Sequence, residues 1–107
     1  MPDAAENRLL SLLTMCRRAG KLLLGFDAVK EAAVRGQVAC VLLAADASAK
    51  TEKEIRFVCK DIPIRRDSRT MDEFAMYFRK RTAVFGVCDS GFAKKLLEYL
   101  PEPMTEE

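Results

Sequence analysis

The stretch that decides the fold runs from residue 18 to residue 46 and reads RAGKLLLG, FDAVKEAAVRG and QVACVLLAAD. The first block predicts a short strand over 21–24 that ends in a turn at Gly25. The second predicts a helix with its apolar positions on one face, closed by Gly36. The third is apolar throughout 38–45, the pattern of a strand covered on both faces. Together the blocks predict a βαβ-like unit whose second strand is central.

Outward from this unit, helix and strand patterns alternate along the whole chain. Capping boxes and helical spacing predict helices over 4–18, where Asp3 is the cap, from Thr51 to about 60, after Thr70 and after Asp89. Asp46 and Ser48 announce the helix that ends near 60, and Ile55, Val58 and Cys59 form its apolar stripe. Further strands are expected at 62–64 and 83–88, and Pro63 places the first of them near an edge or at a strand start. The pattern predicts one α/β domain over 1–107, folded as a three-layer α/β/α sandwich, with an acidic tail from 101 that frays.

Composition is that of an ordinary soluble domain, with 50% hydrophobic and 32% charged residues among 107. No apolar run approaches the roughly 18 residues that a membrane span needs. Asp3 and Glu6 precede the first apolar stretch, so we expect no signal peptide and no membrane association. These features predict a cytoplasmic location.

The side chains that carry common enzyme chemistry are missing or misplaced. The chain has no histidine, and its four cysteines form no Cys-x-x-Cys pair, so we expect reduced core thiols and no metal or cofactor. Gly20 and Gly25 have the glycine spacing of a P-loop, but Phe26 and Asp27 stand where Lys and Ser or Thr would hold phosphate and magnesium. We therefore predict a protein that is not an enzyme.

Charge is distributed unevenly along the chain. Five of the sixteen acids lie at the two ends, whereas all eighteen bases lie between Arg8 and Lys95. Residues 7–101 thus combine eighteen bases with eleven acids, a net charge of +7. A basic body suits an anionic partner, and it is equally consistent with a solvated surface.

Two basic segments are candidates for binding phosphate. The turn at Gly25 leads into a helix N-terminus, a ready-made anion site, with Lys21 just before it and Lys30 within it. The loop of Arg79, Lys80 and Arg81 is suited to a nucleic-acid backbone. Arg17 and Arg18 fall in the last turn of a helix, where they also complement the helix dipole.

These blocks resemble a known family. The run 18–25, the helix ending at 34–36 and the segment 38–48 are similar to the ribosomal protein L7Ae/L30e superfamily, and within it to the short bacterial L7Ae-like proteins. The later blocks 62–64, 72–75 and 89–96 also resemble the family. The similarity covers roughly residues 8–97, in order and with compatible spacing.

The resemblance implies a mixed four-stranded sheet and RNA binding, often to kink-turns. In such proteins the helix after the glycine turn begins with an Asn-Glu pair that reads guanine edges, followed three residues later by a Lys. Here those positions hold Asp27, Ala28 and Glu31. Asp27 is able to accept a hydrogen bond from guanine or to serve as a helix cap, Ala28 is not, and Glu31 repels phosphate.

The resemblance also assigns a second RNA-facing segment to the loop 79–82. We therefore predict non-enzymatic binding of structured RNA, ribosomal or kink-turn-like, with ribosomal or translation-associated proteins as further partners. The candidate RNA-binding residues are Arg17, Arg18, Lys21, Gly25, Phe26, Asp27, Lys30, Arg79, Lys80 and Arg81. Two alternatives stay open: a protein–protein interaction module that kept the fold and lost the RNA site, and a small-ligand or nucleotide-binding module.

Overall fold

Helices and strands alternate along the chain, as predicted. The computed structural model describes residues 4–100, and the side chains from Arg8 onward. Asp3, predicted to cap the first helix, and the tail from 101 lie outside the described residues. The elements are α1 (Ala4–Arg18), β1 (Leu22–Leu24), α2 (Phe26–Val34), β2 (Cys40–Leu43), α3 (Ala49–Val58), β3 (Ile64–Arg66), α4 (Met71–Phe78), β4 (Val84–Val87) and α5 (Ser90–Tyr99).

The sheet is mixed and four-stranded, in the order β1-β4-β2-β3. Strand β2 pairs in parallel with β3, and β4 runs antiparallel to both β1 and β2. The predicted central strand is confirmed because β2 has neighbours on both sides. The βαβ-like unit of β1, α2 and β2 is split, since β4 is inserted between its two strands.

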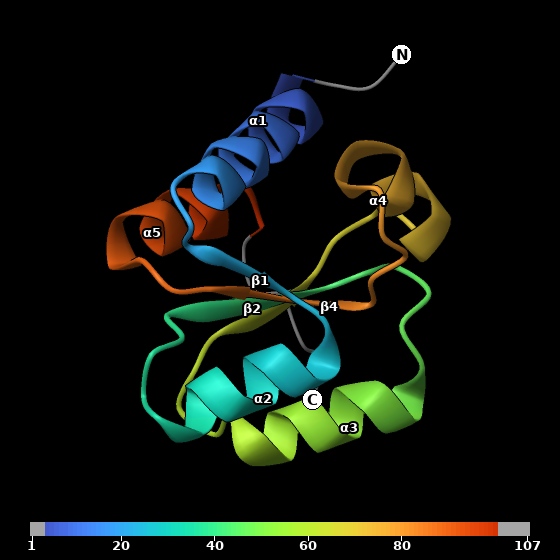
Figure 1. The fold of residues 1–107 in the computed structure, drawn as a ribbon. Helices are drawn as coiled ribbons and strands as arrows, with labels where there is room; N and C mark the ends of the chain where they lie inside the picture. Colours follow the sequence, from blue (N-terminus) through green and yellow to red (C-terminus); the bar gives the residue numbers. More distant parts are fainter. Residues whose placement is uncertain (1–3, 101–107) are drawn as a thin grey trace, which may run out of the picture.

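The three layers are also confirmed (Figure 1): α1, α4 and α5 cover one face of the sheet, and α2 and α3 cover the other. One core cluster joins α1, α4 and α5 to the sheet and includes Leu13, Phe74 and Phe85. The second joins α2 and α3 to the opposite face around Val29, Val41 and Ile55. The alternation of β2 side chains between these clusters explains why that strand is apolar throughout.

Side-chain caps begin three of the helices. Thr70 and Glu73 form the predicted capping box of α4, and Asp89 caps α5 by accepting a hydrogen bond from the Phe92 amide. The capping box predicted at Thr51 is wrong, because α3 begins at Ala49, directly after Ser48, one of the two residues expected to announce this helix. Ser48 is its N-cap, and the Ser48 hydroxyl accepts a hydrogen bond from the Thr51 amide at 3.1 Å.

The strand predicted at 62–64 lies instead at Ile64–Arg66, at the sheet edge beside β2. Pro63 stands just before it, and its carbonyl accepts a hydrogen bond from the Val41 amide at 2.9 Å. Pro63 lacks an N–H but still accepts from the ladder, which is compatible with a strand start. The edge assignment is therefore confirmed, and the strand begins two residues later than predicted.

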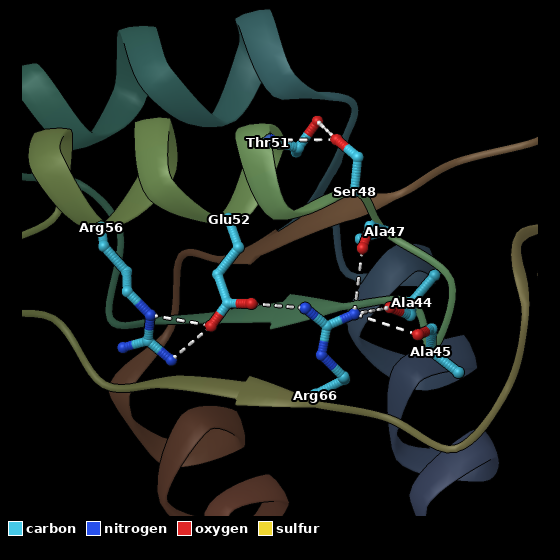
Figure 2. Close-up of polar contacts among 8 residues, drawn as sticks. All are labelled: Ala44, Ala45, Ala47, Ser48, Thr51, Glu52, Arg56 and Arg66. Carbon is cyan, nitrogen blue, oxygen red and sulfur yellow. Dashed lines mark hydrogen bonds and ion pairs between the residues drawn. The ribbon is translucent and has the colours of Figure 1, made fainter.

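Arg66, at the end of β3, organises the turn between β2 and α3 (Figure 2). Its guanidinium donates to the carbonyl oxygens of Ala44 and Ala45 at 3.0 Å and of Ala47 at 3.2 Å. The same group pairs with Glu52, which also binds Arg56 at 2.9 Å. These hydrogen bonds hold the Glu52 pKa below its ordinary value of 4.5, the bond from Arg66 having the largest effect. Arg66 thus fixes the backbone at one edge of the sheet.

The four cysteines are free thiols. Cys16, Cys40 and Cys59 are buried, and Cys88 is half-buried. Burial raises the pKa of Cys16 to about 11 and that of Cys40 to about 12. Within residues 4–100, no helix has both the length and the apolarity to cross a membrane.

Candidate functional site

The two segments predicted to contact RNA meet at the end of the sheet where β1 finishes and β4 begins. Leu24, the last residue of β1, pairs with Phe85 of β4, and the Gly25 amide donates to the Val84 carbonyl at 2.8 Å. The start of α2 therefore lies beside the loop that precedes β4. A Cβ atom at Gly25 would lie 3.9 Å from the Lys80 Nζ atom, so the ammonium group of the loop faces the helix start.

The helix start at Gly25 has an open backbone. Gly25 is the N-cap of α2 and adopts φ 109° and ψ 150°, a conformation that favours glycine over residues with a side chain. Its carbonyl accepts a hydrogen bond from the Val29 amide, but it supplies no side-chain cap. The first amide groups of α2 therefore have N–H donors that no capping side chain uses. These donors, together with the positive end of the helix dipole, are available to an anion.

The remaining α2 candidates face different surroundings. Phe26 is half-buried and packs against the core cluster between α2, α3 and the sheet. Asp27 is exposed as the second residue of the helix; the N-cap is Gly25, so the interpretation of Asp27 as that cap is wrong. Lys30 is exposed one turn after Phe26. Glu31 forms an ion pair with Arg35 at 3.9 Å.

The loop 79–82 is held by its own hydrogen bonds. Arg79 adopts a left-handed conformation with φ 60° and closes α4, its amide donating to the Ala75 carbonyl at 2.8 Å. The buried Thr82 hydroxyl donates to the Lys80 carbonyl at 3.1 Å. Arg81 pairs with Asp72 at 2.7 Å, and this hydrogen bond raises the Arg81 pKa. The loop thus presents Lys80, which forms no ion pair among the described residues.

Arg17 supports this loop. Its guanidinium donates to the Phe78 carbonyl at 3.0 Å and lies 5.4 Å from the centroid of the Phe78 ring. It therefore ties the last turn of α1 to the residue that precedes Arg79. The positive group also complements the C-terminal end of the α4 dipole. Arg18, next to it, is exposed on the last turn of α1.

Lys21 lies apart from Gly25. It stands at the opposite end of β1, about 13 Å away along an extended strand. There its carbonyl accepts a hydrogen bond from the Cys88 amide at 2.8 Å, and it lines an open groove of about 680 Å³ with Gly36 and Gln37. The structure does not bring Lys21 together with Gly25 and Lys80.

Sequence reasoning did not single out the residues of α3 that border the site. Phe26 and Lys30 line an open groove of about 510 Å³ together with Lys53, Arg56 and Phe57. Ile55, Val58 and Cys59 were expected to face the core, so Phe57 falls outside their apolar stripe. A phenylalanine outside that stripe was the feature of the sequence that indicated an exposed ring. Within residues 4–100, no group of three or more cysteine or carboxylate side chains is placed to hold a metal ion.

Comparison with known proteins concerns the fold and the family of the chain. No curated protein matches the chain. A solved structure of a Bacillus halodurans protein of unknown function is 33% identical, with a TM-score of 0.79, over 88% of this chain and 97% of that one. A 15.5 kD RNA-binding protein of Giardia lamblia shares the fold at 16% identity, with a TM-score of 0.71, over 92% of this chain and 87% of that one.

The family of the chain is identified by a family model. The model of the ribosomal protein L7Ae/L30e/S12e/Gadd45 family matches residues 7–97, which span α1 to α5 almost completely. The matched range includes both the helix start at Gly25 and the loop 79–82. The chain therefore belongs to the ribosomal protein L7Ae/L30e/S12e/Gadd45 family.

Proposed function

We propose that the chain binds structured RNA, without catalysis, through the first turn of α2 and the loop 79–82. The observation that carries this proposal is the position of the Lys80 ammonium beside the open backbone of Gly25. A cation and a helix N-terminus at the same point provide a site for a phosphate group. Glycine at the turn lets an RNA backbone approach the protein closely.

Membership of the family and the similar fold of the Giardia lamblia RNA-binding protein support RNA as the ligand class. The site supports phosphate contacts more than base reading. Asp27 is exposed and has a carboxylate for a guanine edge, whereas the exposed Ala28 has no hydrogen-bonding side chain. The ion pair with Arg35 partly neutralises Glu31, which reduces its repulsion of phosphate. Lys30 and Lys80 then supply the attractive charges.

The RNA that we propose is ribosomal or kink-turn-like, bound in the cytoplasm near ribosomal or translation-associated proteins. A panel of a kink-turn RNA, ribosomal RNA fragments and a plain duplex separates these ligands in fluorescence anisotropy titrations. Preference for the kink-turn would assign base reading to Asp27. Equal binding of all structured members would assign binding to the phosphate contacts alone.

The decisive variants are Lys80→Gln and Lys21→Gln. The first removes a positive charge facing Gly25, which follows β1, and the second removes one just before β1. We expect Lys80→Gln to weaken binding about tenfold, or about 1.4 kcal/mol, because it removes the cation at the helix start. The slope of log K against log salt should fall by about one for the same variant. Lys21→Gln, as the matched control, should leave both quantities nearly unchanged.

Equal effects of the two variants, or binding insensitive to salt, would contradict the proposed site. Cross-linking in cells followed by sequencing of bound RNA tests the function itself. Recovery of no RNA above background would favour the alternative, a protein–protein interaction module of the same fold. Lys30 lines two grooves, one with Phe26 and Phe57 and another with Asp27 and Arg35. Both are open to solvent, which does not favour an enclosed small-ligand site there.

A further inference from the structure

The groove between α2 and α3 combines an exposed aromatic ring with several bases. Phe26 and Lys30 line it from α2, and Lys53, Arg56 and Phe57 line it from α3. Phe57 is 74% exposed, although a phenylalanine on a helix that packs on a sheet is normally buried. An exposed large apolar side chain in an open groove indicates a contact surface.

The charges around Phe57 are predominantly positive. The Lys60 ammonium lies 5.3 Å from the centroid of the Phe57 ring. Arg56 is anchored by Glu52 at 2.9 Å, and in the described part of the chain Lys30 and Lys53 form no ion pair. Glu54 is the acid that lines this groove. The surface therefore attracts an anion with an aromatic part.

This combination suits single-stranded nucleic acid better than a protein. Bases stack on aromatic side chains while lysines and arginines follow the phosphates, and such binding tolerates many sequences. Lysine is depleted in protein–protein interfaces relative to the rest of the surface. A ring surrounded by lysines is accordingly the less typical arrangement for a protein partner.

The groove is also continuous with the proposed RNA site. Phe26 directly follows Gly25, which faces Lys80, and Phe26 itself lines the groove. Lys30 lies one turn, about 6 Å, further along α2 and also lines it. A strand that leaves the helix start would therefore enter the groove.

We propose that the α2–α3 groove binds an unpaired segment flanking the structured RNA, with a base stacked on Phe57 and phosphates held by Lys30, Lys53 and Lys60. This inference rests on the proposed function, because the groove extends the same site. Phe57 then acts as a stacking platform, and the structured part of the RNA is still held at Gly25 and Lys80.

The test compares one structured RNA, the best binder of the panel, with the same RNA carrying a five-nucleotide unpaired extension. Oligouridylate of ten nucleotides is titrated separately. The variants are Phe57→Ala, Lys53→Gln and, as a matched control, Tyr77→Ala, which removes an aromatic ring that is 54% exposed on α4. A 5-iodouridine in the extension is photo-cross-linked, and the attached peptide is identified by mass spectrometry.

We expect the extension to tighten binding by the wild type about fivefold to tenfold through one stacked base. Phe57→Ala should abolish this gain without weakening binding of the unextended RNA, Lys53→Gln should reduce it, and Tyr77→Ala should preserve it. The cross-link should map to the peptide containing Phe57. An extension without effect, an equal loss for both RNAs in Phe57→Ala, or a cross-link elsewhere would overturn the proposal.

Two further outcomes separate this inference from the proposed function. Binding of oligouridylate that depends on Phe57, with no binding of any structured RNA, would support the groove and contradict the site at Gly25. Self-association of the wild type that is lost in Phe57→Ala, seen by sedimentation, would instead assign the groove to a second copy of the chain and overturn the inference.

Discussion

Gly86 of β4 lies directly against Val29 of α2. A Cβ atom at Gly86 would stand 3.0 Å from Val29 Cγ2 and 3.3 Å from Cγ1, closer than ordinary van der Waals contact. Val29 is fully buried at this point. The absence of a side chain at Gly86 therefore sets how closely α2 approaches the sheet, and with it the position of Gly25 beside Lys80.

Gly86→Ala should destabilise the protein by about 1–3 kcal/mol, because the added methyl group overpacks the contact with Val29. Urea denaturation of the single variants and of the double variant Gly86→Ala with Val29→Ala gives the coupling energy. The double variant should be less destabilised than the sum of the two single changes, since alanine at 29 makes room. Strict additivity would show that the steric contact is not the cause.

Arg17→Met should lower the free energy of unfolding by about 1 kcal/mol, because Arg17 donates to the Phe78 carbonyl and lies against its ring. Arg18→Met, the neighbouring exposed residue, is the matched control and should change stability by less than about 0.5 kcal/mol. Thermal and chemical denaturation of both variants measure the difference. Similar losses in the two would remove the specific role of Arg17.

The stability contributed by Glu52 should depend on pH. Its pKa is lowered in the folded protein by Arg66 and Arg56, so the contribution is present above the ordinary value of 4.5 and is lost as pH falls through the folded value. Glu52→Gln should therefore cost about 1 kcal/mol at pH 7 and progressively less below pH 4.5. Denaturant unfolding of both proteins across this pH range measures the cost. A cost that does not change with pH would contradict the link between the Glu52 pKa and stability.

The four thiols should differ in reactivity. Burial raises the pKa of Cys16 to about 11 and of Cys40 to about 12, and it also raises that of Cys59, so these groups are protonated and shielded at pH 8. Cys88 is half-buried in the groove beside Lys21, which counteracts part of the rise. A thiol-reactive chromophore should label Cys88 first in the folded protein and all four thiols after denaturation. Rapid labelling of Cys16 or Cys40 in the folded protein would contradict this order.

The same raised pKa values should destabilise the protein at alkaline pH. The folded state binds protons on Cys16 and Cys40 that the unfolded chain releases above its ordinary value of 9.0. The free energy of unfolding should therefore fall as pH rises beyond 9 and towards the folded values. Cys40→Ala should reduce this pH dependence in denaturant titrations.

Local signals in the sequence determined most of the elements of this protein. Thr70 with Glu73 and Asp89 cap their helices as predicted, because a cap depends only on residues within one turn. The apolar run at 38–45 identified a central strand, since only a strand covered on both faces needs apolar side chains at every position. Boundaries were less secure, as β3 and the start of α3 show, because tertiary pairing decides where an element begins.

Only the tertiary structure decided which residues share the candidate site. Inserting β4 between β1 and β2 places Lys80 against Gly25 and leaves Lys21 at the far end of β1. Arg66 likewise donates hydrogen bonds to the backbone of the turn after β2, and Phe57 is exposed in the groove that Lys30 also lines. These contacts join residues far apart in sequence, and their register follows from strand pairing across the whole sheet. The sequence alone therefore identified the basic residues, and the pairing of β4 with β1 selected those that meet.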